Sequence, residues 1–225
     1  MVFKQVEIEI SKFKDFKRPK LKLEQYSTPP QVIKEFLVFI ENDLLNLLEK
    51  SREKNEKVII VDACAGTGFL ALSIALYYYF METNLDNFVF VFIEKDKEAV
   101  EILKENIKYF ENNFSKLNYK IVNEDLFNID SKEIRADFLV MNPPFGVQGK
   151  IKDKNFLNKA LKLSNIVISF HTANSIKFLE KNFCLIDYII VDYPIKQLFW
   201  FHNKNKKDIK VLIAKVSSKE RCSNL

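Results

Sequence analysis

The chain has 225 residues and a formal net charge of +5, which suits one α/β domain and permits an anionic partner without requiring one. Its three cysteines, Cys64, Cys184 and Cys222, are scattered, which argues against a disulfide framework and for a reducing, cytosolic compartment. With only two histidines as well, the chain is a poor candidate for a zinc site. No apolar run approaches membrane-spanning length, and the basic N-terminus lacks the apolar core of a signal peptide, so we expect no membrane partner.

The elements follow from the spacing of apolar residues along the chain. Residues 1–28 are basic and irregular after a short amphipathic segment, and we expect 1–225 to form a single domain. Pro29-Pro30 opens a long helical pattern that reaches about residue 48. Short apolar runs predict strands at 58–61, 88–93, 119–122, 137–141, 165–170, 186–191 and 209–216. Helical patterns lie between them at 69–80, 96–112, 154–164 and 173–182.

Strands that alternate with helices predict a mainly parallel sheet with right-handed crossovers. No helix separates the last two predicted strands, so we expect the final strand to run antiparallel. The predicted fold class is therefore α/β and Rossmann-like. Its sheet has seven mostly parallel strands, an antiparallel final strand and helices on both faces.

A candidate cofactor turn follows the first predicted strand. It reads Asp62-Ala63-Cys64-Ala65-Gly66-Thr67-Gly68 and holds two of the four glycines of the chain. Backbone amides at the start of the next helix face the carboxyl edge of the sheet, where they can bind a ligand. Taken alone, Gly66-x-Gly68-x-x-Ala71 also fits a dinucleotide site, and such a turn is often only a connector.

Carboxylates at three strand ends together favour a bound cofactor over a mere connector. The ribose acid is common to both cofactors, so the Asn-Pro-Pro-Phe motif at 142–145 is what favours S-adenosyl-L-methionine over a dinucleotide. Asp62 can meet the cationic amino group, and Glu94 at the end of the next strand can accept both ribose hydroxyls. Asp125, followed by Leu126, comes after the third strand and can accept from the adenine amine. Singly, Asp62 could be a helix cap and Glu94 the solvated start of a helix. Cys64 is expected to pack in the turn, and we do not propose it as a nucleophile.

The most informative stretch is Asn142-Pro143-Pro144-Phe145, which follows the predicted strand 137–141. The Asn142 side-chain oxygen and the Pro143 carbonyl can accept the two N–H bonds of an exocyclic amine, which orients its nitrogen and stabilises developing positive charge. The prolines stiffen the loop, and Phe145 can stack on a substrate ring. The motif predicts amine methylation; the alternative is a turn that merely ends a strand. It leaves adenine, guanine, cytosine and a protein glutamine amide open.

The N-terminal segment from Phe16 to Pro30, FKRPKLKLEQYSTPP, resembles the signature of the methyltransferase-like protein five family. Members of that family methylate the N6 amine of one adenine in small-subunit ribosomal RNA. The likeness continues through 62–68, 142–146, 169–171 and 199–202, so it covers nearly the whole chain. It implies a class I methyltransferase fold, S-adenosyl-L-methionine as cofactor and Asn142 to Phe145 as the catalytic motif.

The resemblance also implies that Gln25 and Thr28 close over the methionine end of the cofactor and that Thr67 lines it. From the residues alone, Gln25 and Thr28 could equally belong to an extended loop that leads to a helix cap. Cys64 stands where the family usually has glycine, so a positive φ there would strain it and alter cofactor affinity. The residues expected to bind the cofactor are Gln25, Thr28, Asp62, Cys64, Gly66, Thr67, Gly68, Glu94, Asp125 and Leu126.

Basic segments at 12–22, 150–154 and 202–207 flank the predicted site and can bind the phosphates of RNA. Trp200 or Phe201 could stack on an unpaired base. For any single lysine, a solvated surface is the simpler explanation. The residues expected to contact RNA are Lys150, Lys152, Lys154, Trp200, His202, Lys204, Lys206 and Lys207.

In the family, a small zinc-binding activator protein pairs with the edge of the sheet, which implies an interface at the third strand, Tyr119 to Val122. Phe110, Phe114 and Tyr119 could supply apolar contacts there, although core packing explains them too.

The leading prediction is an RNA adenine-N6 methyltransferase that acts on small-subunit ribosomal RNA. A protein-glutamine N-methyltransferase shares the fold and the Asn-Pro-Pro motif. A non-catalytic RNA-binding assembly factor that retains the pocket is a further alternative, suggested only by Cys64. A nicotinamide-dependent dehydrogenase would leave Asn142 to Phe145 unexplained.

Overall fold

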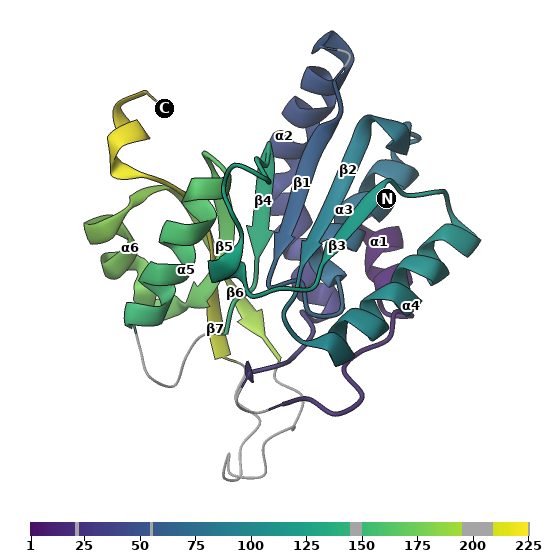
Figure 1. Cartoon of the computed structure of the whole chain (residues 1–225), viewed down its shortest axis with the longest axis horizontal. Helices are drawn as coiled ribbons and strands as arrows, with labels where there is room; N and C mark the ends of the chain where they lie inside the picture. Colours follow the sequence, from purple (N-terminus) through teal and green to yellow (C-terminus); the bar gives the residue numbers. More distant parts are fainter. Residues whose placement is uncertain (21–22, 55, 145–149, 195–208, 225) are drawn as a thin grey trace.

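The structure is a computed structural model that describes residues 1–20, 23–54, 56–144, 150–194 and 209–224. Its centre is a seven-stranded sheet in the order β3-β2-β1-β4-β5-β7-β6 (Figure 1). The strands are β1 (Val58–Ala63), β2 (Phe88–Ile93), β3 (Tyr119–Val122), β4 (Phe138–Met141), β5 (Val167–Thr172), β6 (Cys184–Tyr193) and β7 (Ile209–Ser217).

The five strands from β1 to β5 pair in parallel, whereas β7 runs antiparallel to both β5 and β6. The predicted seven-stranded, mostly parallel sheet with an antiparallel final strand is therefore confirmed. The strands between helices are rich in β-branched and aromatic residues and nearly continuous in apolar character, as strands covered on both faces should be.

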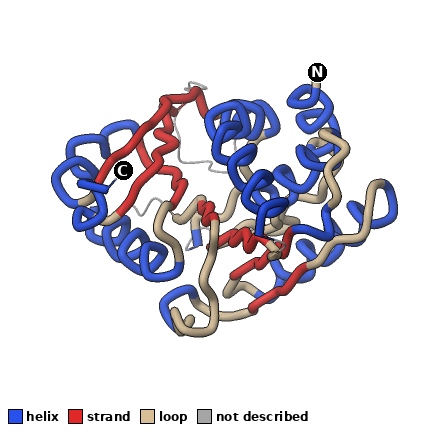
Figure 2. The backbone as a smooth tube through the Cα atoms, turned by 90° about the horizontal axis from the view of Figure 1, so that it is seen from above, coloured by secondary structure: helices blue, strands red, loops and turns tan. Residues whose placement is uncertain are grey.

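Helices cover both faces of the sheet (Figure 2). The core on one face joins the sheet to helices from the first half of the chain, and the core on the other face joins it to later helices. The first group is α1 (Val2–Ile10), α2 (Pro30–Lys54), α3 (Phe69–Phe80) and α4 (Lys97–Asn113), and the second is α5 (Lys150–Leu163) and α6 (Ile176–Asn182). Among the described residues, no helix is long and apolar enough to cross a membrane.

The register of the parallel strands brings their carboxyl ends to one level. Ala63 at the end of β1 lies opposite both Ile93 of β2 and Met141 of β4, and Ile93 lies opposite Val122 of β3. The polar residues at or just beyond these ends are therefore neighbours in space although they are far apart in sequence.

The N-terminal segment crosses this edge of the sheet after α1. The backbone N–H of Lys14 donates to Asn106 Oδ1 at 2.7 Å, and Asn106 Nδ2 donates back to the Lys14 carbonyl at 3.0 Å and to the Thr67 carbonyl at 2.9 Å. Ser27 is hydrogen-bonded to Asp15 at 2.6 Å and to Thr67 at 2.8 Å. Buried Asn106 thus ties the segment to the turn after β1.

The expectation that cysteines would remain unpaired was wrong for two of them, because Cys184 and Cys222 form a disulfide. The pairing follows from the sheet: Cys184 begins β6 opposite Ser217, where β7 ends, and the short helix Lys219–Asn224 returns the chain to it. The separation of 38 residues hides this proximity in the sequence. Cys64 is a free thiol.

β3 is an edge strand of the sheet, as expected, and Tyr119 on it is 44% exposed. Phe110 is fully buried, so core packing, rather than an exposed interface, accounts for this aromatic residue. Its position on the inner face of amphipathic α4 explains the burial.

The backbone conformation at the end of α3 gives a testable prediction about stability. Glu82 has φ +55°, its N–H donates to the Tyr79 carbonyl, and the Thr83 N–H donates to the Tyr78 carbonyl, which together form a Schellman motif. Because this left-handed position favours glycine, we expect Glu82→Gly to raise the free energy of unfolding by about 0.5–1 kcal/mol in urea denaturation. Glu82→Ala is the matched control and should give no such gain; a less stable Glu82→Gly protein would contradict the assignment.

Candidate active site

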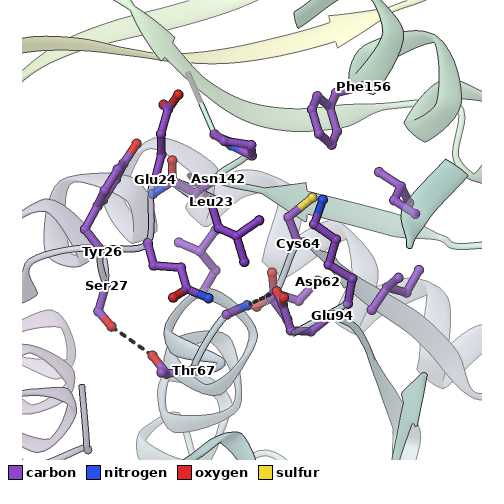
Figure 3. A pocket seen from close by; sticks show the side chains of 18 of the residues that line it. Leu23, Glu24, Tyr26, Ser27, Asp62, Cys64, Thr67, Glu94, Asn142 and Phe156 are labelled. Atoms are coloured by element: carbon purple, nitrogen blue, oxygen red, sulfur yellow. Dashed lines mark hydrogen bonds between the residues drawn. The ribbon is translucent and has the colours of Figure 1, made fainter. Parts of the chain in front are cut away.

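A cavity of about 310 Å³ opens at the carboxyl ends of β1 to β4, under the N-terminal segment (Figure 3). The volume lies at the lower end of the range for small-molecule sites, roughly 300–1,000 Å³. Its wall includes most of the predicted cofactor residues: Gln25, Thr28, Asp62, Cys64, Gly66, Thr67, Glu94, Asp125 and Leu126. Asn142 and Pro144 of the predicted catalytic motif line the same cavity.

The turn between β1 and α3 needs three residues with positive φ. Cys64 has φ +61°, Gly66 +54° and Gly68 +87°. The suspected strain at Cys64 is confirmed, since a non-glycine residue occupies the left-handed region. Gly68 does not line the cavity; a Cβ on it would approach Leu103 to 2.3 Å, so it serves close packing of α3 against α4. Burial, with Glu94 and Asp62 nearby, raises the pKa of the Cys64 thiol well above its ordinary value, which keeps it neutral.

Asp62 lies at the bottom of the cavity and is 1% exposed. Its Oδ2 accepts the Ala71 N–H at 3.0 Å, so it caps the first turn of α3 from the end of β1. Burial raises the pKa of this carboxyl well above its ordinary value, and the nearby Glu94 adds to the shift. The charged form of Asp62 thus lacks a compensating cation and favours a cationic ligand.

Glu94 follows β2 and organises the loops on either side. Its Oε2 accepts the Gly66 N–H and its Oε1 accepts the Asp96 N–H, each at 2.8 Å. Burial raises the pKa of Glu94, an effect that these two backbone hydrogen bonds partly offset. Each carboxylate oxygen keeps a second lone pair, so Glu94 can still accept from vicinal hydroxyls in the cavity.

Gln25 is held against the start of α4. Its Oε1 accepts the Lys20 N–H at 2.9 Å and its Nε2 donates to Asp96, whose other oxygen pairs with Lys20 Nζ at 2.7 Å. Burial alone would raise the pKa of Asp96, but the bonds from Lys20 and Gln25 outweigh it and lower that pKa. These contacts fasten the N-terminal segment at one side of the cavity.

Thr28 and Asn142 meet at the other side. Asn142 follows β4, and its Nδ2 donates to Thr28 Oγ1 at 3.1 Å. The Asn142 Oδ1 is buried and has no hydrogen-bond partner within the described parts of the chain. Pro143 is buried behind the cavity wall, and Phe145 lies outside the described residues. The motif therefore presents one unpaired carbonyl-type acceptor at the site.

Asp125 caps the short helix η3 (Leu126–Asn128) by accepting the Phe127 N–H at 3.1 Å. Leu126 is buried at the cavity wall. Sequence reasoning gave no role to Phe16, Ser27, Lys95, Asn155 or Phe156, which also line the cavity. Phe16 covers Gly66 from the N-terminal segment, and Asn155 and Phe156 come from α5. Phe16 and Ser27 belong to the N-terminal signature, but no local pattern assigns any of these residues to the wall, because only the crossing of distant segments brings them there.

Little of the predicted RNA-binding set falls within the described structure. Trp200, His202, Lys204, Lys206 and Lys207 lie outside the described residues. Lys150 and Lys152 belong to the first turn of α5, and Lys154 is exposed on the same helix.

In the N-terminal basic segment, several lysines are already paired with carboxylates. Lys12 pairs with Glu9, and Lys14 and Lys17 pair with Glu105 of α4. Lys20 contacts Asp96 and Glu98. These lysines fasten the segment to neighbouring helices, which makes it a weaker candidate for phosphate binding.

Residues 42–183 match the family model described as the methyltransferase small domain. The chain belongs to this family. The matched range contains the turn after β1, the end of β2 and Asn142, and S-adenosyl-L-methionine is the cofactor of such a methyltransferase.

Relatives cover nearly the whole chain. An rRNA N(6)-adenosine-methyltransferase of Danio rerio is 26% identical over 94% of this chain and 96% of its own, and one of Drosophila melanogaster is 28% identical over 87% of each. The crystal structure of PH1948 from Pyrococcus horikoshii superposes with a TM-score of 0.75 and 32% identity, over 97% of this chain and 98% of that one.

The residues at the cavity fit this cofactor on chemical grounds. Asp62 offers a buried carboxylate without a countercharge, which suits the cationic amino group. Glu94 retains acceptor capacity at mid-cavity, and the positive-φ turn at Gly66 brings backbone close to a ligand.

The buried charge of Asp62 gives a pH-dependent prediction. The unfolded carboxyl has a pKa near ~3.9 and the folded pKa is raised, so the folded protein loses stability as pH rises above ~4. Asp62→Asn keeps an acceptor for the Ala71 N–H and removes the charge. We expect the cofactor-free variant to melt above the wild type at pH 7, with the difference shrinking toward pH 4.

The same variant should lose cofactor-induced stabilisation. At a concentration about 100-fold above Kd, S-adenosyl-L-methionine should stabilise the wild type by about 2.7 kcal/mol and Asp62→Asn by less. Asp130→Asn, which changes an exposed carboxylate of the loop after η3, is the control and should behave as the wild type. Equal cofactor-induced shifts in Asp62→Asn and wild type would contradict the role of Asp62.

Proposed function

We propose that the protein transfers a methyl group from S-adenosyl-L-methionine to the N6 amine of an adenine in small-subunit ribosomal RNA. The observation that carries this proposal is the buried Asn142 Oδ1 at the cavity beyond β4, which has no hydrogen-bond partner among the residues that the structure describes. A buried carbonyl oxygen without a donor costs roughly 1–3 kcal/mol, so a native site that keeps one implies a ligand that supplies the donor. An exocyclic amine is such a donor.

The cofactor would lie along the strand ends. Asp62 and Gln25 with the turn at Gly66 would hold its methionine end, Glu94 its ribose, and Asp125 with Leu126 its adenine. The N-terminal residues 1–28 would close this site from outside, because Phe16 and residues 23–28 form one wall of the cavity. Their hydrogen bonds to Asn106, Thr67 and Asp96 support a fastened cover rather than a free tail.

The amine would be held by the loop after β4. When bound, S-adenosyl-L-methionine would supply an electrophilic methyl group for transfer to the amine nitrogen. Asn142 Oδ1 accepts one N–H of the amine, and the Pro143 carbonyl would accept the other. These acceptors draw electron density toward the nitrogen and stabilise the positive charge that develops on it. The proton then leaves to water, since a methylated arylammonium is acidic.

The choice of adenine in ribosomal RNA rests on the relatives. The proteins of Danio rerio and Drosophila melanogaster carry the name rRNA N(6)-adenosine-methyltransferase and align along most of this chain. The N-terminal Glu24-Gln25-Tyr26 with Thr28 lines the same cavity as Asn142, which supports one continuous site for cofactor and base. Phosphates would be bound by Lys150, Lys152, Lys154 and the segment 202–207. Phe145 would stack on the target base, and Trp200 or Phe201 on an unpaired base.

We further propose that a small activator protein adds to the exposed edge strand β3, where Tyr119 is 44% exposed. A cytoplasmic location follows from the ribosomal substrate alone. The Cys184–Cys222 bond gives it no support, because disulfides are unusual in reducing compartments.

A labelled methyl-transfer assay on unmodified small-subunit ribosomal RNA, with large-subunit RNA in parallel, tests the proposal. The expected product is N6-methyladenosine at one position of the small-subunit RNA, identified by nucleoside analysis. Label on the large-subunit RNA alone would show that the substrate is large-subunit and not small-subunit RNA. If methyl transfer survives nuclease treatment and labels a protein acceptor, the substrate is a protein glutamine amide and not RNA.

Asn142→Ala should reduce turnover on the order of 100-fold, because one charge-stabilising acceptor is lost. Cofactor affinity, measured by calorimetry, should remain near the wild-type value. Asn182→Ala on α6, where the side chain bonds only its own helix carbonyl, is the control and should retain activity. Unchanged turnover in Asn142→Ala would rule out the proposed role.

A further inference from the structure

The residue that ends β6, Tyr193, places a second unusual group behind the cavity wall, beside Thr28 and Asn142. Tyr193 is 2% exposed, and its ring packs edge-on against Tyr26 of the N-terminal segment, with centroids 5.8 Å apart. β6 lies at the opposite edge of the sheet from β3, so Tyr193 approaches the site from a different direction than the cofactor loops (Figure 1).

The hydroxyl of Tyr193 lies beside the side chains of Thr28 and Asn142. It is buried and has no well-formed hydrogen bond with any residue that the structure describes, as is also true of Asn142 Oδ1. Two unpaired buried polar atoms therefore occur in one small cluster, next to a hydrogen bond from Asn142 Nδ2 to Thr28 Oγ1. Such atoms are rare in folded proteins and indicate a group poised for another partner.

The Tyr193 hydroxyl keeps its proton at neutral pH. Burial raises the pKa of this phenol well above its ordinary value, and the neighbouring Thr28 and Asn142 offset only part of the shift. A neutral phenol can accept one hydrogen bond and donate another.

The orientation of the Asn142 amide decides whether it can hold an amine. With the oxygen toward the cavity it accepts an N–H, but after a flip it presents its own NH₂ and repels the amine. Thr28 alone does not choose between the two orientations, because its hydroxyl can accept from Nδ2 or donate to Oδ1. If a neighbouring group accepts the Thr28 hydroxyl proton, Thr28 can act toward Asn142 only as an acceptor. Asn142 must then turn its Nδ2 toward Thr28, and its Oδ1 faces the other way.

We propose that Tyr193 is a positioning residue that accepts the Thr28 hydroxyl proton and so holds the Asn142 amide oxygen toward the substrate amine. The inference rests on the proposed amine methylation and deepens it. The relay runs from Asn142 Nδ2 to Thr28 Oγ1 and on to the Tyr193 hydroxyl. It joins the N-terminal segment, the loop after β4 and the end of β6 through one set of polar atoms.

Tyr193→Phe removes only the hydroxyl and keeps the ring contact with Tyr26. With the RNA that the wild type methylates, we expect kcat to fall about tenfold, the scale of one misplaced hydrogen bond. The KM for RNA and the Kd for S-adenosyl-L-methionine should stay within about twofold, because neither ligand loses a direct contact. Thr28→Val should lower kcat similarly.

Double variants separate positioning from a general loss of packing. If Tyr193 acts through Asn142, Tyr193→Phe should cause no further loss in the Asn142→Ala background, and its effect should not add to that of Thr28→Val. Tyr78→Phe is the matched control. Tyr78 is also fully buried, and its hydroxyl donates to the Leu44 carbonyl at 2.8 Å beside Phe88, which begins β2 at the other end of the sheet. Tyr78→Phe should lower stability and leave kcat unchanged.

The outcomes distinguish this inference from the function on which it rests. If the wild type methylates its RNA and Tyr193→Phe has the same kcat, the proposed function remains intact and the positioning role is overturned. A raised KM for RNA at unchanged kcat would also overturn it, because it would indicate direct base contact. The positioning role would also be overturned if the losses of kcat in Tyr193→Phe and Asn142→Ala were fully additive in the double variant. A wild type without methyl transfer to any amine would remove the proposed function and this inference together.

Discussion

The parallel register of β1 to β4 is the constraint on which the site depends. Because Ala63, Ile93, Val122 and Met141 end their strands at one level, the groups that follow them share one cavity. A shift of one residue in any of these strands would exchange its two faces and move a functional side chain into the core. The apolar cores on both faces of the sheet, with α3 and α5 packed against them, hold this register.

The same cavity concentrates polar groups that are costly to bury without a ligand. Asp62 and Glu94 have raised pKa values because of burial, and Asn142 keeps an unpaired oxygen. Backbone hydrogen bonds from Ala71, Gly66 and Asp96 hold the carboxylates in place and offset part of this cost. A site arranged in this way is preorganised: a cationic, hydroxyl-bearing ligand and an amine find their partners already oriented.

The N-terminal segment completes this arrangement from a distant part of the sequence. Asn106 of α4, Asp96 at the start of that helix and Thr67 each bond to it, and Thr67 itself lines the cavity. The segment that lines one wall of the cavity is therefore held by the turn after β1 and by the start of α4. Thr28 extends these contacts to Asn142 in the loop after β4.

The local sequence determined where most strands of the sheet form and which polar residues lie at their ends. Apolar runs mark β1, β2 and β4 because strands buried on both faces must be apolar, and Asp62, Glu94 and Asn142 stand out because they are polar residues at the ends of such runs. Only the tertiary structure decided which groups meet across long separations: Cys184 with Cys222, Thr28 with Asn142 and Tyr193, and Phe156 with the cavity. Local spacing carries no record of these encounters, because they depend on where the sheet ends each strand and how the connecting segments cross it.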